Sequence, residues 1–314
     1  MRAFCLHWLS SLLAFPVPFT LFSRQLLHSP QFPAVLYCRK AFIGGETIHI
    51  SVLAHKSPHK KEIEDAFCLS EDLCSFGVFD GVTPLNGEVW SGGHNGAYLA
   101  SRMLAASLHA FQKSDPLSEW LFAANTSLLT AMMEAGVDLE ERHYRWSSCA
   151  AAVRISGDQA EYVQCGDCMI LREDDEGVIH QVTVNSVQGI SERAIEFRKS
   201  LREKGLLSQD ESFYDDPAER MKFNRSLANR PAGYSVVNGD QELRSFVQEG
   251  AFSIKNTKSF LLISDGFFHP EMDLTDSYKE IKSVGLEAYA QALRFHEYTN
   301  RLHHDDMTAI YAEF

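Results

Sequence analysis

The chain has 314 residues, of which 45% are hydrophobic and 23% charged. This composition is that of a folded globular protein and excludes a disordered or collagen-like chain. The formal net charge of −13 argues against a surface built to hold nucleic acid, so we expect no nucleic-acid partner. An anionic substrate is still compatible with this charge, because bound metal ions supply local positive charge.

An apolar extension precedes the predicted domain. Residues 4–22 carry almost no charge, which fits a signal peptide or a short membrane anchor. Two prolines interrupt this run, which fits instead a segment that lies outside the domain. Both interpretations of residues 1–44 stay open, and residues 45–314 are expected to form a single domain. We expect a cytoplasmic protein, with membrane anchoring through residues 4–22 as the alternative.

The cysteines favour reduced thiols. Their number, seven, is odd, and several lie within apolar runs, which is not typical of a disulfide framework. Cys165 and Cys168 are separated by two residues, but no second pair accompanies them. We therefore interpret them as part of a turn between strands rather than as a zinc or redox site.

Hydrophobic periodicity predicts alternating groups of strands and helices from residue 45 onward. The charged segment 191–229 favours helix, with a break at Asp215-Asp-Pro217. Helices inserted between runs of strands indicate an α+β fold rather than a parallel sheet. The predicted strands are 47–54, 66–70, 74–79, 148–155, 160–164, 169–172, 259–264 and 307–314, and the other predicted helices are 96–111, 117–133 and 286–302.

Carboxylates gather at the ends of these strands. Asp80-Gly81 and Asp265-Gly266 each follow an apolar strand, and the pairs Glu64-Asp65 and Asp305-Asp306 each precede one. A single Asp-Gly is usually a turn, but several such ends in one domain place like charges together unless a cation neutralises them. Oxygen ligands suit hard cations such as Mg²⁺ and Mn²⁺. The pattern therefore predicts an acidic metal site, most suited to phosphate hydrolysis.

In chain order these residues resemble the type 2C metal-dependent serine/threonine protein phosphatases, from about Ile48 to Phe314. The motifs that carry the resemblance are Glu64-Asp65, Phe79-Asp80-Gly81, Gly92-Gly93-His94, Ser147-Ser-Cys-Ala-Ala-Ala, Gly166-Asp167, Ser264-Asp265-Gly266 and Asp305-Asp306-Met-Thr308. The resemblance implies a four-layer α-β-β-α sandwich of two antiparallel sheets flanked by helices. It also implies hydrolysis of phosphomonoesters on phosphorylated proteins by a metal-activated water.

The resemblance further implies which residues form the site. Asp80 would bridge two Mn²⁺ or Mg²⁺ ions, and Asp265 and Asp305 would complete the first ion's ligands. These three aspartates are therefore the expected catalytic residues. The remaining expected ligands are the Gly81 carbonyl for the second ion, Glu64 and Asp65 for its waters, and Asp167 for a third, weaker ion.

Three departures from the family pattern bear on mechanism. Val82 stands where many members have a histidine general acid, so that role is vacant or belongs to a metal-bound water or to a nearby His94. Residues 82–91 form a local insertion. Lys60 aligns with the family's phosphate-binding arginine and, unlike arginine, cannot form a two-pronged contact with phosphate. We therefore expect weaker substrate binding through Lys60 than in the family members that carry arginine at this position.

Other interpretations remain. Residues 191–231 fall where the family carries a variable flap beside the active site. An inactive regulatory pseudophosphatase and a phosphatase of small metabolites are the alternative functions. We expect a monomer, which associates with membranes only if the N-terminal apolar segment acts as an anchor. His303-His304 are candidate metal ligands, but exposure at a helix end is the interpretation that we favour.

Overall fold

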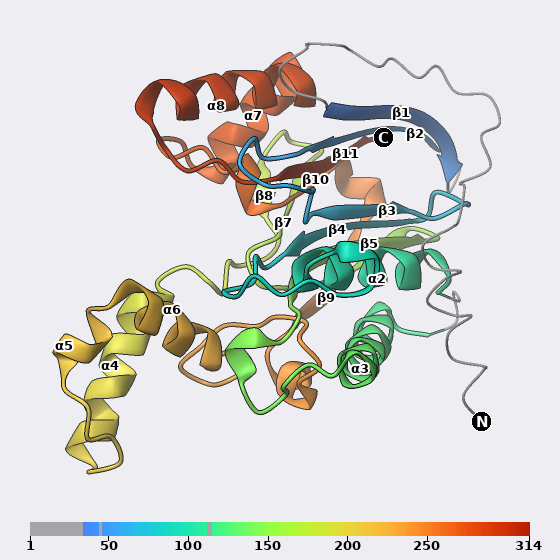
Figure 1. Ribbon diagram of the computed structural model, residues 1–314. Coiled ribbons are helices and arrows are strands. Elements are labelled where there is room, and N and C mark those ends of the chain that lie inside the picture. Colours follow the sequence, from blue (N-terminus) through green and yellow to red (C-terminus); the bar gives the residue numbers. More distant parts are fainter. Residues whose placement is uncertain (1–33, 44–45, 112–114) are drawn as a thin grey trace.

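The computed structural model describes residues 34–43, 46–111 and 115–314. Two antiparallel sheets face each other, and helices cover the outer face of each sheet (Figure 1). The predicted four-layer α-β-β-α sandwich is therefore confirmed.

The first sheet contains both the N-terminal and the C-terminal described strands. Its first strand precedes the domain start expected at residue 45, yet it pairs with the second along its whole length, from Ala34 opposite His55 to Ile43 opposite Glu46. The sheet order is β1 (Ala34–Ile43), β2 (Glu46–His55), β11 (Met307–Glu313), β10 (Thr257–Ile263), β7 (Met169–Asp174) and β8 (Ile179–Gln181).

Two neighbouring strands of the second sheet, β4 and β5, are buried on both faces. In β4, Phe76 and Val78 point between the sheets, whereas Phe79 points toward the helices, because successive side chains alternate across a strand. The same alternation places Ala151 and Ala152 on opposite faces of β5. The sheet order is β3 (Ala66–Leu69), β4 (Ser75–Gly81), β5 (Ser148–Ser156), β6 (Gln159–Cys165) and β9 (Gln248–Ser253).

Two helices cover each sheet. Helices α2 (Gly96–His109) and α3 (Leu117–Ala135) pack on the second sheet through Leu104 and Trp120, while α7 (Leu274–Val284) and α8 (Leu286–Asn300) pack on the first. The side chain of Asn95 caps α2 by accepting a hydrogen bond from the Tyr98 amide, and Gly136, with φ 79°, ends α3. Short 3-10 turns occur at Ser91–Gly93, Arg142–Tyr144, Gln241–Ser245, Ile254–Asn256 and Asp265–Phe267.

A small helical unit projects from the sandwich where the variable flap is expected (Figure 1). It comprises α4 (Ile190–Glu203), α5 (Glu211–Tyr214) and α6 (Pro217–Ser226). The predicted break falls where Asp216 caps α6 and Pro217 begins it. The unit has its own core, in which the Arg198 guanidinium lies 4.7 Å from the ring centre of Tyr214 and 4.9 Å from that of Phe223.

The apolar run at residues 4–22 lies outside the described residues. Within the described part of the chain, no helix has the length and apolar character needed to cross a membrane. The six described cysteines, Cys165 and Cys168 among them, form no disulfide.

Candidate active site

The predicted acidic residues come together at one end of the sandwich. Asp80 lies near the end of β4, Asp265 follows β10, and Asp305 precedes β11. Burial raises the pKa of Asp80 well above its usual range, and repulsion by the carboxylates of Asp65, Asp265, Asp167 and Asp305 raises it further. The five side chains repel one another because they lie together in one site.

The neighbouring carboxylates are perturbed for the same reason. Burial is the main cause that raises the pKa of Asp65 to about 7, and repulsion from Asp306 is the next largest. The pKa of Asp265 lies well above its usual range because of burial and the charges of Asp167 and Asp305, and burial also raises the pKa of Asp167. Without a metal ion, some of these carboxyl groups must therefore be protonated. A bound metal ion would balance their negative charge instead.

Several of these oxygens are buried without a partner. Both carboxylate oxygens of Asp65, Oδ1 of Asp167 and Oδ1 of Asp265 have no hydrogen-bond donor among the described residues. A buried ionised carboxylate is costly unless it is paired or coordinates a metal. An all-oxygen donor set with these orphaned atoms fits Mg²⁺ or Mn²⁺. No three Asp, Glu, His or Cys side chains of the described residues are arranged as a ready metal-binding group.

Lys60 supplies positive charge inside this cluster. Its Nζ lies 2.5 Å from Asp305 Oδ1, 2.8 Å from Glu64 Oε2 and 3.4 Å from Asp306 Oδ2. Burial alone would lower the pKa of Lys60, but the charges of Asp305 and Asp306 raise it above its ordinary value. The residue predicted to bind substrate phosphate is therefore paired with the acidic cluster itself.

Asp306 is an anchor for the backbone. Its Oδ1 accepts a hydrogen bond from the Ser57 amide at 2.6 Å, and its Oδ2 accepts one from the Glu64 amide at 2.7 Å. These bonds join the segment before β11 to the segment that carries Lys60 and Glu64. The sequence pointed to the Asp305-Asp306 pair but did not distinguish the two roles.

Glu64 is held by three donors. Besides Lys60, Thr83 Oγ1 and Asn95 Nδ2 each donate to its carboxylate at 2.5 Å. Sequence reasoning missed both Thr83 and Asn95. The helix-capping pattern at the start of α2 was the available signal for Asn95, whereas Thr83 lies in the insertion and had none.

Two glycines of the site are required by close packing. A Cβ on Gly81 would lie 2.6 Å from the carbonyl oxygens of Ala97 and Glu64. A Cβ on Gly266 would lie 1.9 Å from the carbonyl oxygen of Asp306. The Asp-Gly pairs are thus places where the backbone segments of the acidic cluster meet, and the glycine is needed for that approach.

The expected alternative proton donor is engaged elsewhere. His94 Nδ1 lies 2.5 Å from Glu62 Oε2, and its ring stacks on Tyr98 with centroids 4.0 Å apart. Val82 contributes no ionisable group and packs against the core between the sheets. The ring of His94 is therefore oriented by Glu62 and Tyr98.

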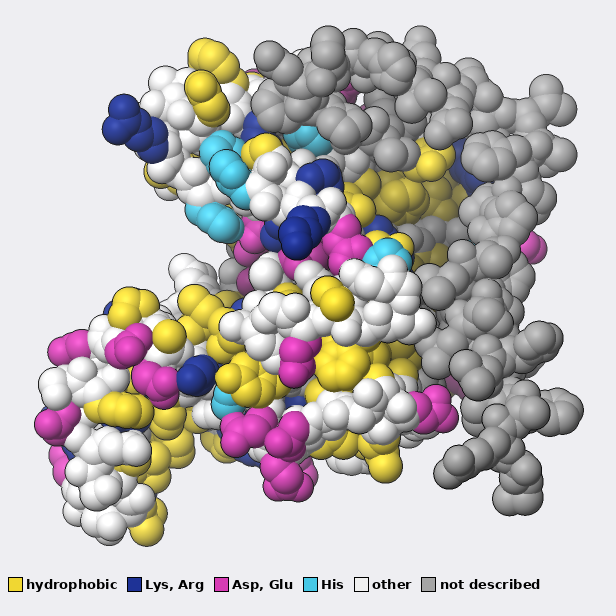
Figure 2. Space-filling view, in the orientation of Figure 1, with side chains coloured by type: hydrophobic (Ala, Val, Ile, Leu, Met, Phe, Trp, Pro, Cys, Tyr) yellow, Lys and Arg dark blue, Asp and Glu magenta, His cyan; other side chains and the backbone are white. Residues whose placement is uncertain are grey.

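The flap reaches the site through Arg225. Its guanidinium donates a hydrogen bond to the Thr83 carbonyl at 2.6 Å, and the charge of Glu64 acts on it. Burial lowers the pKa of Arg225 from its ordinary value. The surface view shows acidic, basic and histidine side chains along the recess between the α7–α8 layer and the flap helices (Figure 2). Arg225 was not singled out by the sequence.

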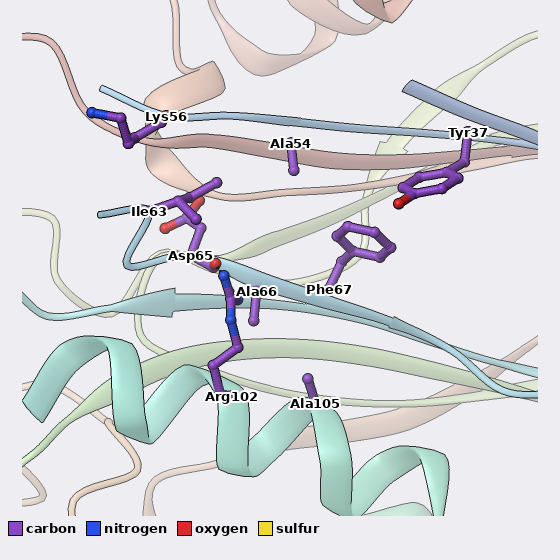
Figure 3. Close-up of a pocket in the computed structure, with 9 residues that line it drawn as sticks. All are labelled: Tyr37, Ala54, Lys56, Ile63, Asp65, Ala66, Phe67, Arg102 and Ala105. Atoms are coloured by element: carbon purple, nitrogen blue, oxygen red, sulfur yellow. Dashed lines mark hydrogen bonds between the residues drawn. The ribbon is translucent and has the colours of Figure 1, made fainter. Parts of the chain in front are cut away.

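A cavity of about 320 Å³ adjoins the acidic cluster between the sheet edges (Figure 3). Tyr37 and Phe67 line one part of it, and Lys56 and Arg102 line the other. Arg102 Nη1 donates to the carbonyl of Asp65 at 2.5 Å, which fixes the backbone of this ligand candidate from the side of α2.

Comparison with known proteins is consistent with this arrangement. The family model for protein phosphatase 2C matches residues 64–306. No curated protein matches the sequence significantly. Serine/threonine phosphatase Stp1 from Staphylococcus aureus is 17% identical, with a TM-score of 0.52, over 84% of this chain and 94% of that one.

Two further solved structures share the fold. The serine/threonine phosphatase PstP/Ppp of Mycobacterium tuberculosis is 15% identical, with a TM-score of 0.54, over 85% of this chain and 98% of that chain. The catalytic domain of PstP in complex with two manganese ions is 14% identical, with a TM-score of 0.53, over 85% of this chain and 97% of that chain. Because the family model spans most of the sequence, the chain belongs to the protein phosphatase 2C family.

Proposed function

We propose that this metal-dependent phosphatase hydrolyses phosphoserine and phosphothreonine in proteins at the cluster around Asp80. The observation that carries this proposal is the set of buried carboxylate oxygens without partners in Asp65, Asp167 and Asp265, which lie beside the ends of strands within the matched family region. When bound, Mn²⁺ or Mg²⁺ ions lower the pKa of water and offset the charge of phosphate.

The position of each residue supports a particular role. Asp80, repelled by all four neighbouring aspartates, is suited to bridge two ions. Asp265 and Asp305 are suited to hold the first ion, and the Gly81 carbonyl the second. Two ions are proposed by analogy with the PstP structure that contains two manganese ions. Glu64 and Asp65 are proposed to hold the water ligands of the second ion. Asp167 is proposed to help hold a third ion.

The chain's own groups bind and orient the substrate. Lys60 and Arg225 approach Glu64 from the segment before β3 and from the flap, respectively. Metal ions bound at Asp305 would compete with the Lys60 ammonium for this carboxylate, which would leave the ammonium available to phosphate. The flap carries Arg225 and is therefore the element proposed to select the protein substrate.

Simple measurements distinguish the proposed function from its two alternatives. A pseudophosphatase is not favoured, because Asp80, Asp265 and Asp305 are all present and close together. A phosphatase of small metabolites would hydrolyse phosphorylated sugars or nucleotides better than a phosphothreonine peptide. The cytoplasmic location and the monomeric state expected from the sequence stay predictions.

The test combines metal binding with turnover. We expect wild-type protein to bind two Mn²⁺ ions by isothermal titration calorimetry and to hydrolyse a phosphothreonine peptide. Asp265→Asn should lose the tighter binding step and most of the turnover. Asp175→Asn, an exposed aspartate, is the matched control and should change neither. Two-ion binding without turnover on any peptide, but with turnover on a metabolite, would contradict the protein-substrate assignment.

A further inference from the structure

Thr83 lies between the acidic cluster and the flap helices. It follows β4 by two residues, at the start of the insertion 82–91, and it is exposed to solvent. Its Oγ1 donates a hydrogen bond to Glu64 Oε2 at 2.5 Å, and its backbone carbonyl accepts one from Arg225 Nη2 at 2.6 Å. Because Thr83 is exposed, these two hydrogen bonds rather than burial fix its position.

The side-chain bond of Thr83 orients a carboxylate of the proposed metal site. The hydroxyl and the Lys60 ammonium, which lies 2.8 Å away, meet at Glu64 Oε2, while Asn95 Nδ2 donates to Oε1 at 2.5 Å. Unlike the ammonium, the hydroxyl and the amide carry no net charge and do not repel a cation bound beside the carboxylate. Such outer partners of a metal site orient the ligands and contribute to metal affinity. The Thr83 hydroxyl is therefore placed to hold Glu64 in one orientation when a cation is bound.

The carbonyl of Thr83 is a contact point between α6 and the sandwich. Arg225 lies in the last turn of α6, and the flap helices share a core of their own, so a bond at this helix end acts on the flap as a unit. A second bond also reaches this helix end. Arg142 Nε donates to the Ser226 carbonyl at 3.2 Å, but this arginine is paired with Asp240, which is not part of the acidic cluster. The bond from Arg225 to Thr83 therefore leads from the flap to Glu64.

We propose that Thr83 is a positioning residue that couples the flap to the carboxylate beside the second metal ion. A cation that fixes Glu64 also fixes Thr83 as the acceptor for Arg225, and a flap held by Arg225 fixes Glu64 for the cation. This coupling is reciprocal in binding free energy. The place of Glu64 at the second ion rests on the proposed function, but cation binding and flap motion are both measured without turnover.

The first measurement is cation affinity. Manganese chloride is titrated by calorimetry into the full chain as wild type, as Thr83→Val, which keeps the side-chain shape without the donor, and as Thr83→Ser, which keeps the donor. Thr83→Val should weaken the weaker of the two Mn²⁺ binding steps about tenfold, and Thr83→Ser should bind as wild type does. The matched control is Thr126→Val, because Thr126 is also exposed and its Oγ1 donates to the Phe122 carbonyl at 3.0 Å within α3. Unchanged Mn²⁺ affinity in Thr83→Val would overturn the proposal.

The second measurement is amide hydrogen exchange in α4, α5 and α6, in EDTA and in saturating Mn²⁺. In wild type and in Thr83→Ser, Mn²⁺ should slow exchange in these helices, whereas in Thr83→Val most of this slowing should be lost although the site is filled. A purely local role at Glu64 would not produce this difference. Equal urea denaturation midpoints in EDTA check that Thr83→Val is folded like wild type.

Two outcomes of the exchange measurement would contradict the coupling. One is exchange in the wild-type flap that does not respond to Mn²⁺, and the other is slowing in Thr83→Val that equals that in wild type. Failure to hydrolyse any phosphopeptide, with both Mn²⁺ effects present, would count against the proposed function and leave the coupling supported.

Discussion

Replacing Asp65 by asparagine should stabilise the metal-free protein in a pH-dependent way. Burial and the charge of Asp306 raise the pKa of Asp65 from the ordinary 3.8 to about 7 in the folded protein. Folding raises the pKa of this carboxyl group. At a pH below its pKa in the unfolded chain, the group is protonated in both states and costs no stability. As the pH rises from that value toward its pKa in the folded protein, the folded state loses stability. The relevant window therefore lies between about pH 4 and pH 7.

The size of the effect follows from the same values. A rise of about three pH units, at about 1.4 kcal/mol per unit, corresponds to about 4 kcal/mol. In EDTA, Asp65→Asn should raise the free energy of unfolding by about this amount at pH 8 and by under about 1 kcal/mol at pH 4. Excess Mn²⁺ should then stabilise the wild type more than the variant, because the cation neutralises the carboxylate that the variant lacks.

Urea denaturation at pH 4, 6 and 8, in EDTA and in Mn²⁺, measures these differences. The exposed Asp175→Asn is the control, and its free energy of unfolding should stay within about 0.5 kcal/mol of wild type at each pH. A variant that is no more stable than wild type at pH 8 in EDTA, or a difference that does not change with pH, would refute the reasoning about a buried, repelled carboxylate.

Three further substitutions test neighbouring features. Lys60→Arg should lower KM for a phosphothreonine peptide severalfold in steady-state assays, because a guanidinium binds phosphate with two parallel hydrogen bonds; an unchanged KM would show that this side chain does not reach the substrate. Gly266→Ala should cost about 1–3 kcal/mol in urea denaturation, since its Cβ would meet the carbonyl of Asp306, whereas Gly87→Ala, which meets nothing within 4 Å, serves as the control. Arg225→Ala should raise KM for the phosphopeptide about tenfold with little effect on p-nitrophenyl phosphate. An equal loss on both substrates would indicate that Arg225 only supports the flap.

Much of the fold was predictable because its strands are strongly patterned. Strands such as β4 and β10 are apolar runs followed by Asp-Gly, and each has a neighbouring strand on both sides in its sheet. The edge strands β8 and β9 were not predicted, since they are short and largely exposed and carry little hydrophobic signal. β1 was assigned to the N-terminal extension, although its sequence is joined to that of β2 by Gly44-Gly45, a pair typical of short hairpin loops.

The sequence predicted which carboxylates form the site, but it did not predict the contacts among the side chains. Motif order indicated Asp80, Asp265 and Asp305, because each lies at a strand end that the fold brings to one edge. It did not indicate that Lys60 would pair with Asp305, or that His304 would turn inward onto His59. These contacts join residues about 245 positions apart, and only the packing of the segment before β11 against the segment before β3 creates them.

The most direct test is hydrolysis of a phosphothreonine peptide by the full chain in Mn²⁺, in EDTA and with Asp80→Asn. Turnover in Mn²⁺ that is abolished by EDTA, and lowered by at least about a thousandfold in the variant although it stays folded, is the predicted result. Turnover that survives EDTA, or an Asp80→Asn variant as active as wild type, would contradict a metal-dependent phosphatase centred on Asp80.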